Sequence, residues 1–313
     1  MLKLILKSIS KILGYSIIHP RKAKIVYGSI IKGISKILLY SLFNSKEVKI
    51  GIKKLREKDE DFKVLDISYK EIPKEIDIPS NNKYLKNSKY IQRDADKIVE
   101  LSNSLMKISI DKEDYIKKVF DFVQNKISFG INSDESALGT LMEGQAFCYG
   151  KMNLMAALLR RQEIEARFKI VPIIIENKIV NFVGNDMNNN SQDLLLRLVN
   201  NLVPHAILEV KLNNEWIEAD PVIPINLCGY LKYPIIKFGD HSLWIKEKSS
   251  DVVYLSEIPF FFTDLLEALS NKKIAFYINK TSQEGEKIGK EFINRCGGEK
   301  EYNKFLLRRY INV

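Results

Sequence analysis

Apolar residues recur at helical spacing in three stretches of the central chain. Within residues 90–106 they share one face, and a second helix is expected after Asp111, whose side chain is placed to cap it. The third stretch covers residues 148–161, with a predicted buried side of Leu154, Met155, Leu158 and Leu159. Residues 131–146 show no such period, and we expect them to form a loop.

Strand patterns follow the third helix. Residues 167–175 are rich in β-branched side chains, and residues 205–212 and 215–220 flank Asn213-Asn214, a pair typical of tight hairpin turns. Such a hairpin has one wholly apolar face: Ala206, Leu208, Val210, Leu212, Ile217 and Ala219. Three helices followed by strands predict an α+β fold, with helices on one side of an antiparallel sheet.

Pattern and composition together divide the chain into four regions: a basic amphipathic helical extension (1–58), a connector (59–89), a main domain (90–250) and a mainly helical C-terminal segment (251–313). In the last region we expect helices over Thr263–Ser270 and Glu284–Arg295.

Positive charge is concentrated in the first region. Residues 1–58 hold 14 Lys and Arg but only two acids, whereas the remaining 255 residues hold 35 basic and 37 acidic residues. Lys3, Lys7 and Lys11 recur every four residues, opposite an apolar helical face. Two interpretations stay open: residues 1–43 bind an anionic membrane surface, or the helix packs as a cap on the body or on a partner chain. The stretch has few aromatics and no recognisable binding module, which disfavours nucleic acid.

Composition narrows the class of protein further. The 313 residues are 45% hydrophobic and 28% charged, which excludes a fully disordered or collagen-like chain. Three cysteines cannot form a disulfide scaffold and favour a reducing compartment. No apolar run reaches the roughly 18 residues of a membrane span, and no signal-peptide core is present, so we expect a cytoplasmic protein, with peripheral membrane association left open. No metal motif occurs, and we expect no metal and no cofactor.

The candidate chemistry lies on the hairpin and the third helix. The predicted pairing places His205 and Asp220 on the same face, one diagonal step apart, so that the carboxylate can accept a hydrogen bond from the imidazole. Cys148 opens the third helix, where the helix dipole favours a thiolate. Thiolate, imidazole and carboxylate are the groups needed for acyl transfer through a thioester. The competing interpretations are a buried structural cysteine and a surface histidine.

Three segments, in this order, resemble the transglutaminase-like superfamily: YIKKVFDFVQNKISFG (115–130), CYGKMNLMAALLRRQEIEAR (148–167) and HAILEVKLNNEWIEADPV (205–222). The resemblance covers about residues 90–225. It implies a papain-like α+β core, in which a Cys-bearing helix packs on an antiparallel sheet. It also implies that Cys148 is the nucleophile, His205 the general base and acid, and Asp220 the orienting acid.

Two further residues have open roles. Gln145 could point its amide into the oxyanion hole, and Lys151 could support the thiolate or be a solvated face residue. The resemblance implies an enzyme that cleaves or exchanges an amide bond of a peptide or protein. We expect hydrolysis rather than cross-linking, because the chain lacks the calcium motif and secretion signal of the larger animal cross-linking enzymes. The alternative is a catalytically silent binding or scaffold protein. Oligomeric state is left open.

Overall fold

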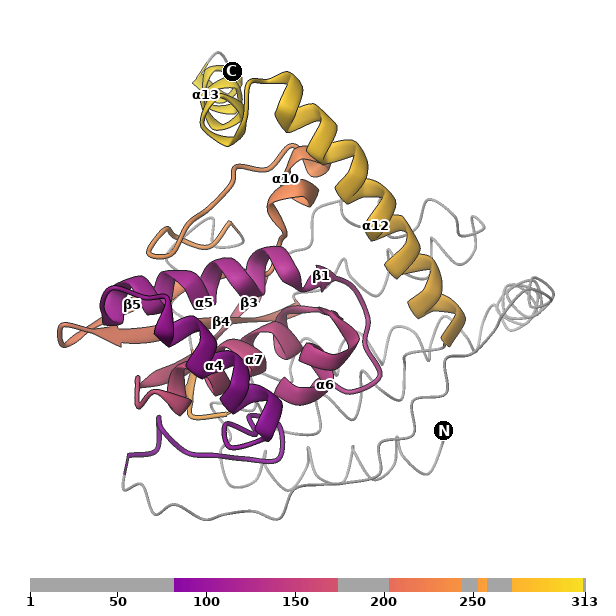
Figure 1. The fold of residues 1–313 in the computed structure, drawn as a ribbon. Helices are drawn as coiled ribbons and strands as arrows, with labels where there is room; N and C mark the ends of the chain where they lie inside the picture. Colours follow the sequence, from indigo (N-terminus) through magenta and orange to yellow (C-terminus); the bar gives the residue numbers. More distant parts are fainter. Residues whose placement is uncertain (1–81, 174–202, 244–252, 258–271, 312–313) are drawn as a thin grey trace.

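A computed structural model describes residues 82–173, 203–243, 253–257 and 272–311 (Figure 1). The expected basic extension, most of the connector and the expected helix over Thr263–Ser270 lie outside these residues. The described helices are α4 (Asp96–Lys107), α5 (Lys112–Lys126), α6 (Ala137–Glu143), α7 (Cys148–Arg161), α10 (Ile225–Leu231), α12 (Lys272–Arg295) and α13 (Glu299–Ile311). The described strands are β1 (Ser128–Phe129), β2 (Gln145–Ala146), β3 (Ala166–Ile173), β4 (Val203–Leu212), β5 (Glu215–Ala219) and β6 (Val253–Leu255).

The main sheet is antiparallel, with the strand order β5-β4-β3-β6. Its hairpin has the predicted register, in which Leu212 pairs with Glu215. Asn213 and Asn214 have φ of 50° and 66°, the left-handed values that a two-residue turn needs and that asparagine tolerates. The predicted α+β class, with a Cys-bearing helix on an antiparallel sheet, is therefore confirmed.

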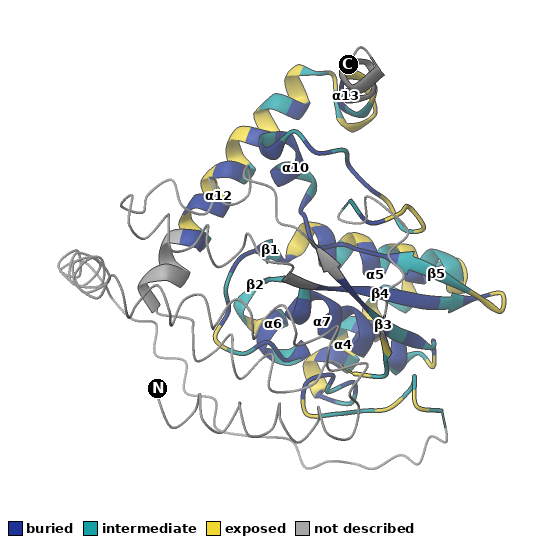
Figure 2. Ribbon diagram, turned by 180° about the vertical axis from the view of Figure 1, so that it is seen from behind, coloured by how far each residue is buried: buried dark blue, intermediate teal, exposed yellow. Residues whose placement is uncertain are grey.

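Helix α7 occupies the centre of the molecule. It contacts α4, α5 and α6 as well as β3 and β4, and every residue from Tyr149 to Arg160 is buried (Figure 2). The predicted buried side of this helix was therefore too narrow, because elements pack around its whole circumference. A helix held on all sides presents its first residue, Cys148, at a fixed position.

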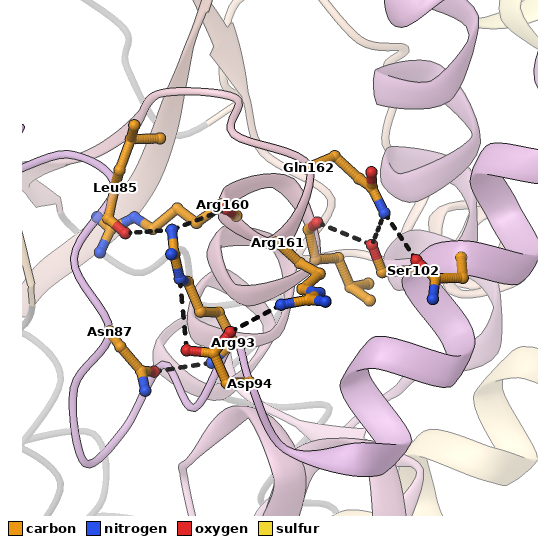
Figure 3. Close-up of polar contacts among 10 residues, drawn as sticks. Leu85, Asn87, Arg93, Asp94, Ser102, Arg160, Arg161 and Gln162 are labelled. Atoms are coloured by element: carbon orange, nitrogen blue, oxygen red, sulfur yellow. Dashed lines mark hydrogen bonds and ion pairs between the residues drawn. The ribbon is translucent and has the colours of Figure 1, made fainter. Parts of the chain in front are cut away.

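The far end of α7 is fixed by two buried arginines (Figure 3). Arg160 donates to the carbonyls of Lys86 and Ala166, each at 2.8 Å. Arg93 donates to the carbonyls of Leu85, at 2.7 Å, and of Arg160, at 3.1 Å. These bonds join α7 to the segment before α4 and to the start of β3, so both guanidinium groups have a structural role.

Several predicted boundaries were wrong. The helix expected over residues 90–106 begins only at Asp96, because the preceding residues form turns in which Gln92 has a φ of 44°. Residues 131–146, expected to be a loop, contain α6 and β2; the helix is only seven residues long, and Gly144 ends it in a left-handed conformation. The helix expected over Glu284–Arg295 begins earlier, at Lys272. Helix α10 was not expected, and α13 lies in the region expected to be mainly helical, although its bounds were not predicted.

Helix α12 runs along one side of the molecule, with α10 packed against it (Figure 1). The two helices cross closely at Gly229 and Gly289, where a Cβ on Gly289 would lie 1.8 Å from the Asn226 carbonyl oxygen. Within the described ranges, no helix is both long and apolar enough to cross a membrane.

Candidate active site

Cys148 is the first residue of α7. The preceding residue, Phe147, has an extended backbone and gives the helix no side-chain cap, so the amides of the first turn are not capped by it. Cys148 is half-buried, whereas Cys228 is completely buried in α10. Cys148 therefore combines partial exposure with the positive end of a helix dipole, and the sequence predicted its place at the start of this helix.

The hairpin brings His205 and Asp220 into direct contact. The Nε2 atom of His205 lies 3.0 Å from Oδ2 of Asp220, and both side chains are buried. Ile207 on the same face of β4 and Ala206 on the opposite face are also completely buried, so this end of the sheet is covered on both faces. Sequence reasoning placed the two residues on the same face, and the structure places them within hydrogen-bonding distance.

The third member of the predicted set reaches the same imidazole. Cys148 acts on His205 from the start of α7, both as a hydrogen-bonding partner and through its charge, while Asp220 contacts Nε2 of the ring. Burial lowers the pKa of His205, but the Asp220 carboxylate and the Cys148 side chain raise it more strongly, to about 10. The imidazole is therefore protonated at neutral pH.

Ser242 also contacts the carboxylate, and sequence reasoning missed it. Its hydroxyl donates to Oδ2 of Asp220, and its side chain is buried. A serine in a loop after a turn has no pattern that marks it, and only the folded chain brings it to Asp220.

Lys151 is completely buried, so the interpretation as a solvated face residue was wrong. Its ammonium group donates to the carbonyl of Pro221, the residue after Asp220, at 3.3 Å. Burial lowers the pKa of Lys151 to about 7, although the charges of Glu286, Asp220 and Cys228 act to raise it. The lysine thus lies beneath the acid end of the site and not on the surface.

Gln145 does not lie free beside the sulfur. Its side-chain amide donates to the Ile131 carbonyl at 3.1 Å, and the Asn279 side chain from α12 donates to the same oxygen at 2.9 Å. Asn279 also accepts from the Ile131 amide at 2.8 Å. Gln145 is therefore held by the segment after β1, and its role in an oxyanion hole stays a prediction.

Among the described residues, no group of three or more His, Cys, Asp or Glu side chains is arranged to hold a metal ion. A shallow polar pocket of about 210 Å³ lies elsewhere, beside the hairpin turn, and its walls are Lys112, Glu163, Glu165, Lys211, Asn213 and Asn214. That pocket contains none of the three predicted catalytic side chains.

Comparison with known families agrees with the resemblance seen in the sequence. Residues 99–221 match the model of the Transglutaminase-like superfamily. This segment is transglutaminase-like. It contains Cys148, His205 and Asp220, whereas Ser242 and Asn279 lie beyond it.

The whole-chain comparisons add little to this family match. A solved structure from Cytophaga hutchinsonii, named a "Putative Cysteine Protease", aligns with 46% of this chain and 43% of its own, at 22% identity and a TM-score of 0.32. The chain thus spans less than half the length of that protein. No curated protein matches the chain.

Proposed function

We propose that this protein is a cysteine-dependent enzyme that cleaves an amide bond of a peptide or protein through a thioester on Cys148. One observation carries the proposal: the His205 ring is in direct contact with the Asp220 carboxylate, and Cys148 acts on the same ring from the start of α7. The transglutaminase-like segment supports the same general type of chemistry.

Each group has a defined task in this reaction. The Cys148 thiolate attacks the carbonyl carbon, so that a C–S bond forms and the oxygen becomes an oxyanion. The His205 imidazolium gives its proton to the leaving amine as the C–N bond breaks. Water then attacks the thioester, His205 accepts its proton, and the thiolate leaves as the acid forms. Asp220 holds the ring in position and stabilises its charge throughout.

The backbone amide of Cys148 supports the oxyanion in this scheme, because it belongs to the first turn of α7 and has no partner within the helix. An amine in place of water would give acyl transfer. We favour hydrolysis, on the sequence argument given above.

The test is the rate of iodoacetamide alkylation at each of the three cysteines, measured by mass spectrometry from pH 5 to 10. We expect Cys148 to react at least tenfold faster than Cys228 and Cys296 near pH 7, and His205→Ala to abolish this difference. The matched control is His241→Ala, because His241 has a 94% exposed side chain and contacts Glu218 rather than the sulfur. Fast and His205-dependent alkylation then justifies a screen of peptide amides, in which Cys148→Ala must be inactive but folded.

If Cys148 reacts like the other two cysteines in all three proteins, there is no thiolate–imidazolium pair and the enzyme proposal is wrong. The catalytically silent binding protein would then be the better interpretation. Vesicle co-sedimentation of the full chain, compared with a chain that starts at Asp59, tests the proposed membrane role of the basic extension; equal binding contradicts it.

A further inference from the structure

The Asp220 carboxylate receives two hydrogen bonds, both on the same oxygen. Oδ2 lies 3.0 Å from His205 Nε2 and also accepts from the Ser242 hydroxyl. The other oxygen, Oδ1, is buried and accepts no hydrogen bond from the described part of the chain. The orientation of the carboxylate therefore depends on the contacts of a single oxygen.

The loop that carries Ser242 is fixed to the end of β5 by several bonds. The Gly239 amide donates to the Glu218 carbonyl at 3.2 Å, and Gly239 has a φ of 92°, a conformation that suits glycine. The Glu218 carboxylate accepts from the Ser242 backbone amide and lies 3.3 Å from His241 Nδ1. Since Glu218 is two residues before Asp220, the strand that leads directly to the acid also holds the loop that contacts it.

Burial limits which other groups could hydrogen-bond to Oδ2 of Asp220. Ser242 is 3% exposed and Asp220 is also 3% exposed, so bulk water has little access to either side chain. A buried carboxylate that loses a hydrogen bond pays a desolvation cost, and rotation about its side-chain torsions is one way to recover a partner. For Asp220 such a rotation would take Oδ2 away from His205.

We propose that Ser242 is a positioning residue for the reaction proposed above: its hydroxyl holds Asp220 so that Oδ2 faces His205 Nε2. The inference rests on the proposed function for its purpose, but the geometry that it concerns can be measured without any turnover. Ser242 also lies outside the segment that matches the superfamily, so the site in this chain extends beyond that segment.

Other charged or titratable groups act on the same pair and stay in place when Ser242 is changed. Cys148 acts on His205 from α7, and Lys151 acts on Asp220 from the same helix. Cys228 interacts with Asp220 from α10, and Glu286 of α12 acts on Lys151. A change in His205 after the replacement of Ser242 therefore reports on the Asp220–His205 contact.

The experiment is an NMR titration of the imidazole groups in the full chain, which has only three histidines, so that variants of His19 and His241 assign His205. In the wild type we expect His205 to titrate with a pKa of about 10, as its buried contacts with Asp220 and Cys148 dictate. In Ser242→Ala we expect a fall of at least one pH unit, a tenfold loss in proton affinity, because Asp220 turns away. The same replacement in an Asp220→Asn background should cause no further fall.

The matched control is Ser102→Ala. Ser102 is also a buried serine, but its hydroxyl contacts Tyr115 and the Leu158 carbonyl, away from the site. We expect this variant to lower the unfolding temperature without changing the His205 titration. An unchanged or raised pKa of His205 in Ser242→Ala overturns the inference, since a raised value means that the hydroxyl only weakens the Asp220 charge. Slow alkylation of Cys148 contradicts the proposed function instead, so the two failures are distinct.

Discussion

Replacement of Lys151 by methionine should change stability in a way that depends strongly on pH. Lys151 is completely buried, and burial lowers its pKa from 10.5 to about 7. At about 1.4 kcal/mol per pKa unit, this shift means that folding with a charged Lys151 costs about 5 kcal/mol more than folding with a neutral one. Methionine has a similar length and no charge, so Lys151→Met removes this term while it largely fills the same space.

The direction in which stability changes with pH follows from the number of protons bound in the folded and unfolded states. Between pH 7 and pH 10.5 the unfolded chain holds a proton on Lys151 that the folded chain has lost, so the free energy of unfolding rises with pH through this window. Below pH 7 the folded protein bears the full cost of the buried charge, and above pH 10.5 it bears none. Lys151→Met should therefore stabilise the protein most at low pH.

The lost hydrogen bond opposes this gain. Lys151 donates to the Pro221 carbonyl, and a buried carbonyl left without a partner costs about 1–3 kcal/mol. The expected net effect of Lys151→Met is thus a stabilisation of about 2–4 kcal/mol at pH 6, which changes to a destabilisation of about 1–3 kcal/mol above pH 10.5.

Urea unfolding at pH 6, 8 and 10 measures the difference between wild type and variant. The matched control is Lys287→Met, which removes an exposed lysine on α12 and should show no comparable dependence on pH. If Lys151→Met changes stability by the same amount at all three values of pH, the buried lysine is not discharged in the way that we describe, and the reasoning fails.

Two smaller predictions concern the elements that hold the site. Arg160→Met should lower the free energy of unfolding by about 3 kcal/mol or more, because the carbonyls of Lys86 and Ala166 lose a buried donor. The rate of Cys148 alkylation in the folded variant should nevertheless match wild type. A large loss of Cys148 reactivity would contradict a purely structural role for Arg160. Gly289→Ala should lower the thermal midpoint of unfolding by several degrees, because its Cβ would lie 1.8 Å from the Asn226 carbonyl oxygen. The control Lys290→Ala, on the exposed side of α12, should leave the midpoint unchanged. Equal midpoints for the two variants would mean that α10 and α12 do not cross as described.

The main parts of the fold could be predicted because they follow local rules. The limits of α7 follow from an unbroken helical period, and the hairpin register follows from a two-residue Asn-Asn turn between strands that alternate in polarity. Once the register was known, simple strand geometry placed His205 and Asp220 together. Their direct contact then depends only on the length of two side chains.

What the sequence could not show are contacts between segments that are far apart in the chain and have no periodic pattern. Asn279 lies 148 residues from Ile131, yet it binds both the amide and the carbonyl of that residue. The burial of Lys151 is a similar case, since helical spacing alone cannot tell a face that meets solvent from one that is covered by distant parts of the chain. Helix α6 escaped detection for a different reason: seven residues are too few to establish a period.

These missed contacts share a physical consequence for the candidate site. The residues that match the superfamily place the sulfur, the imidazole and the carboxylate, and they supply some of the partners that a buried carboxylate and a buried ammonium group need: His205 for Asp220 and the Pro221 carbonyl for Lys151. In this chain further partners come from later residues: Ser242 on Asp220, and Glu286 near Lys151. The reactivity of Cys148 should therefore depend on Ser242 and Glu286 as well as on the family motifs, and variants of these two residues that leave the fold intact are the ones to compare first.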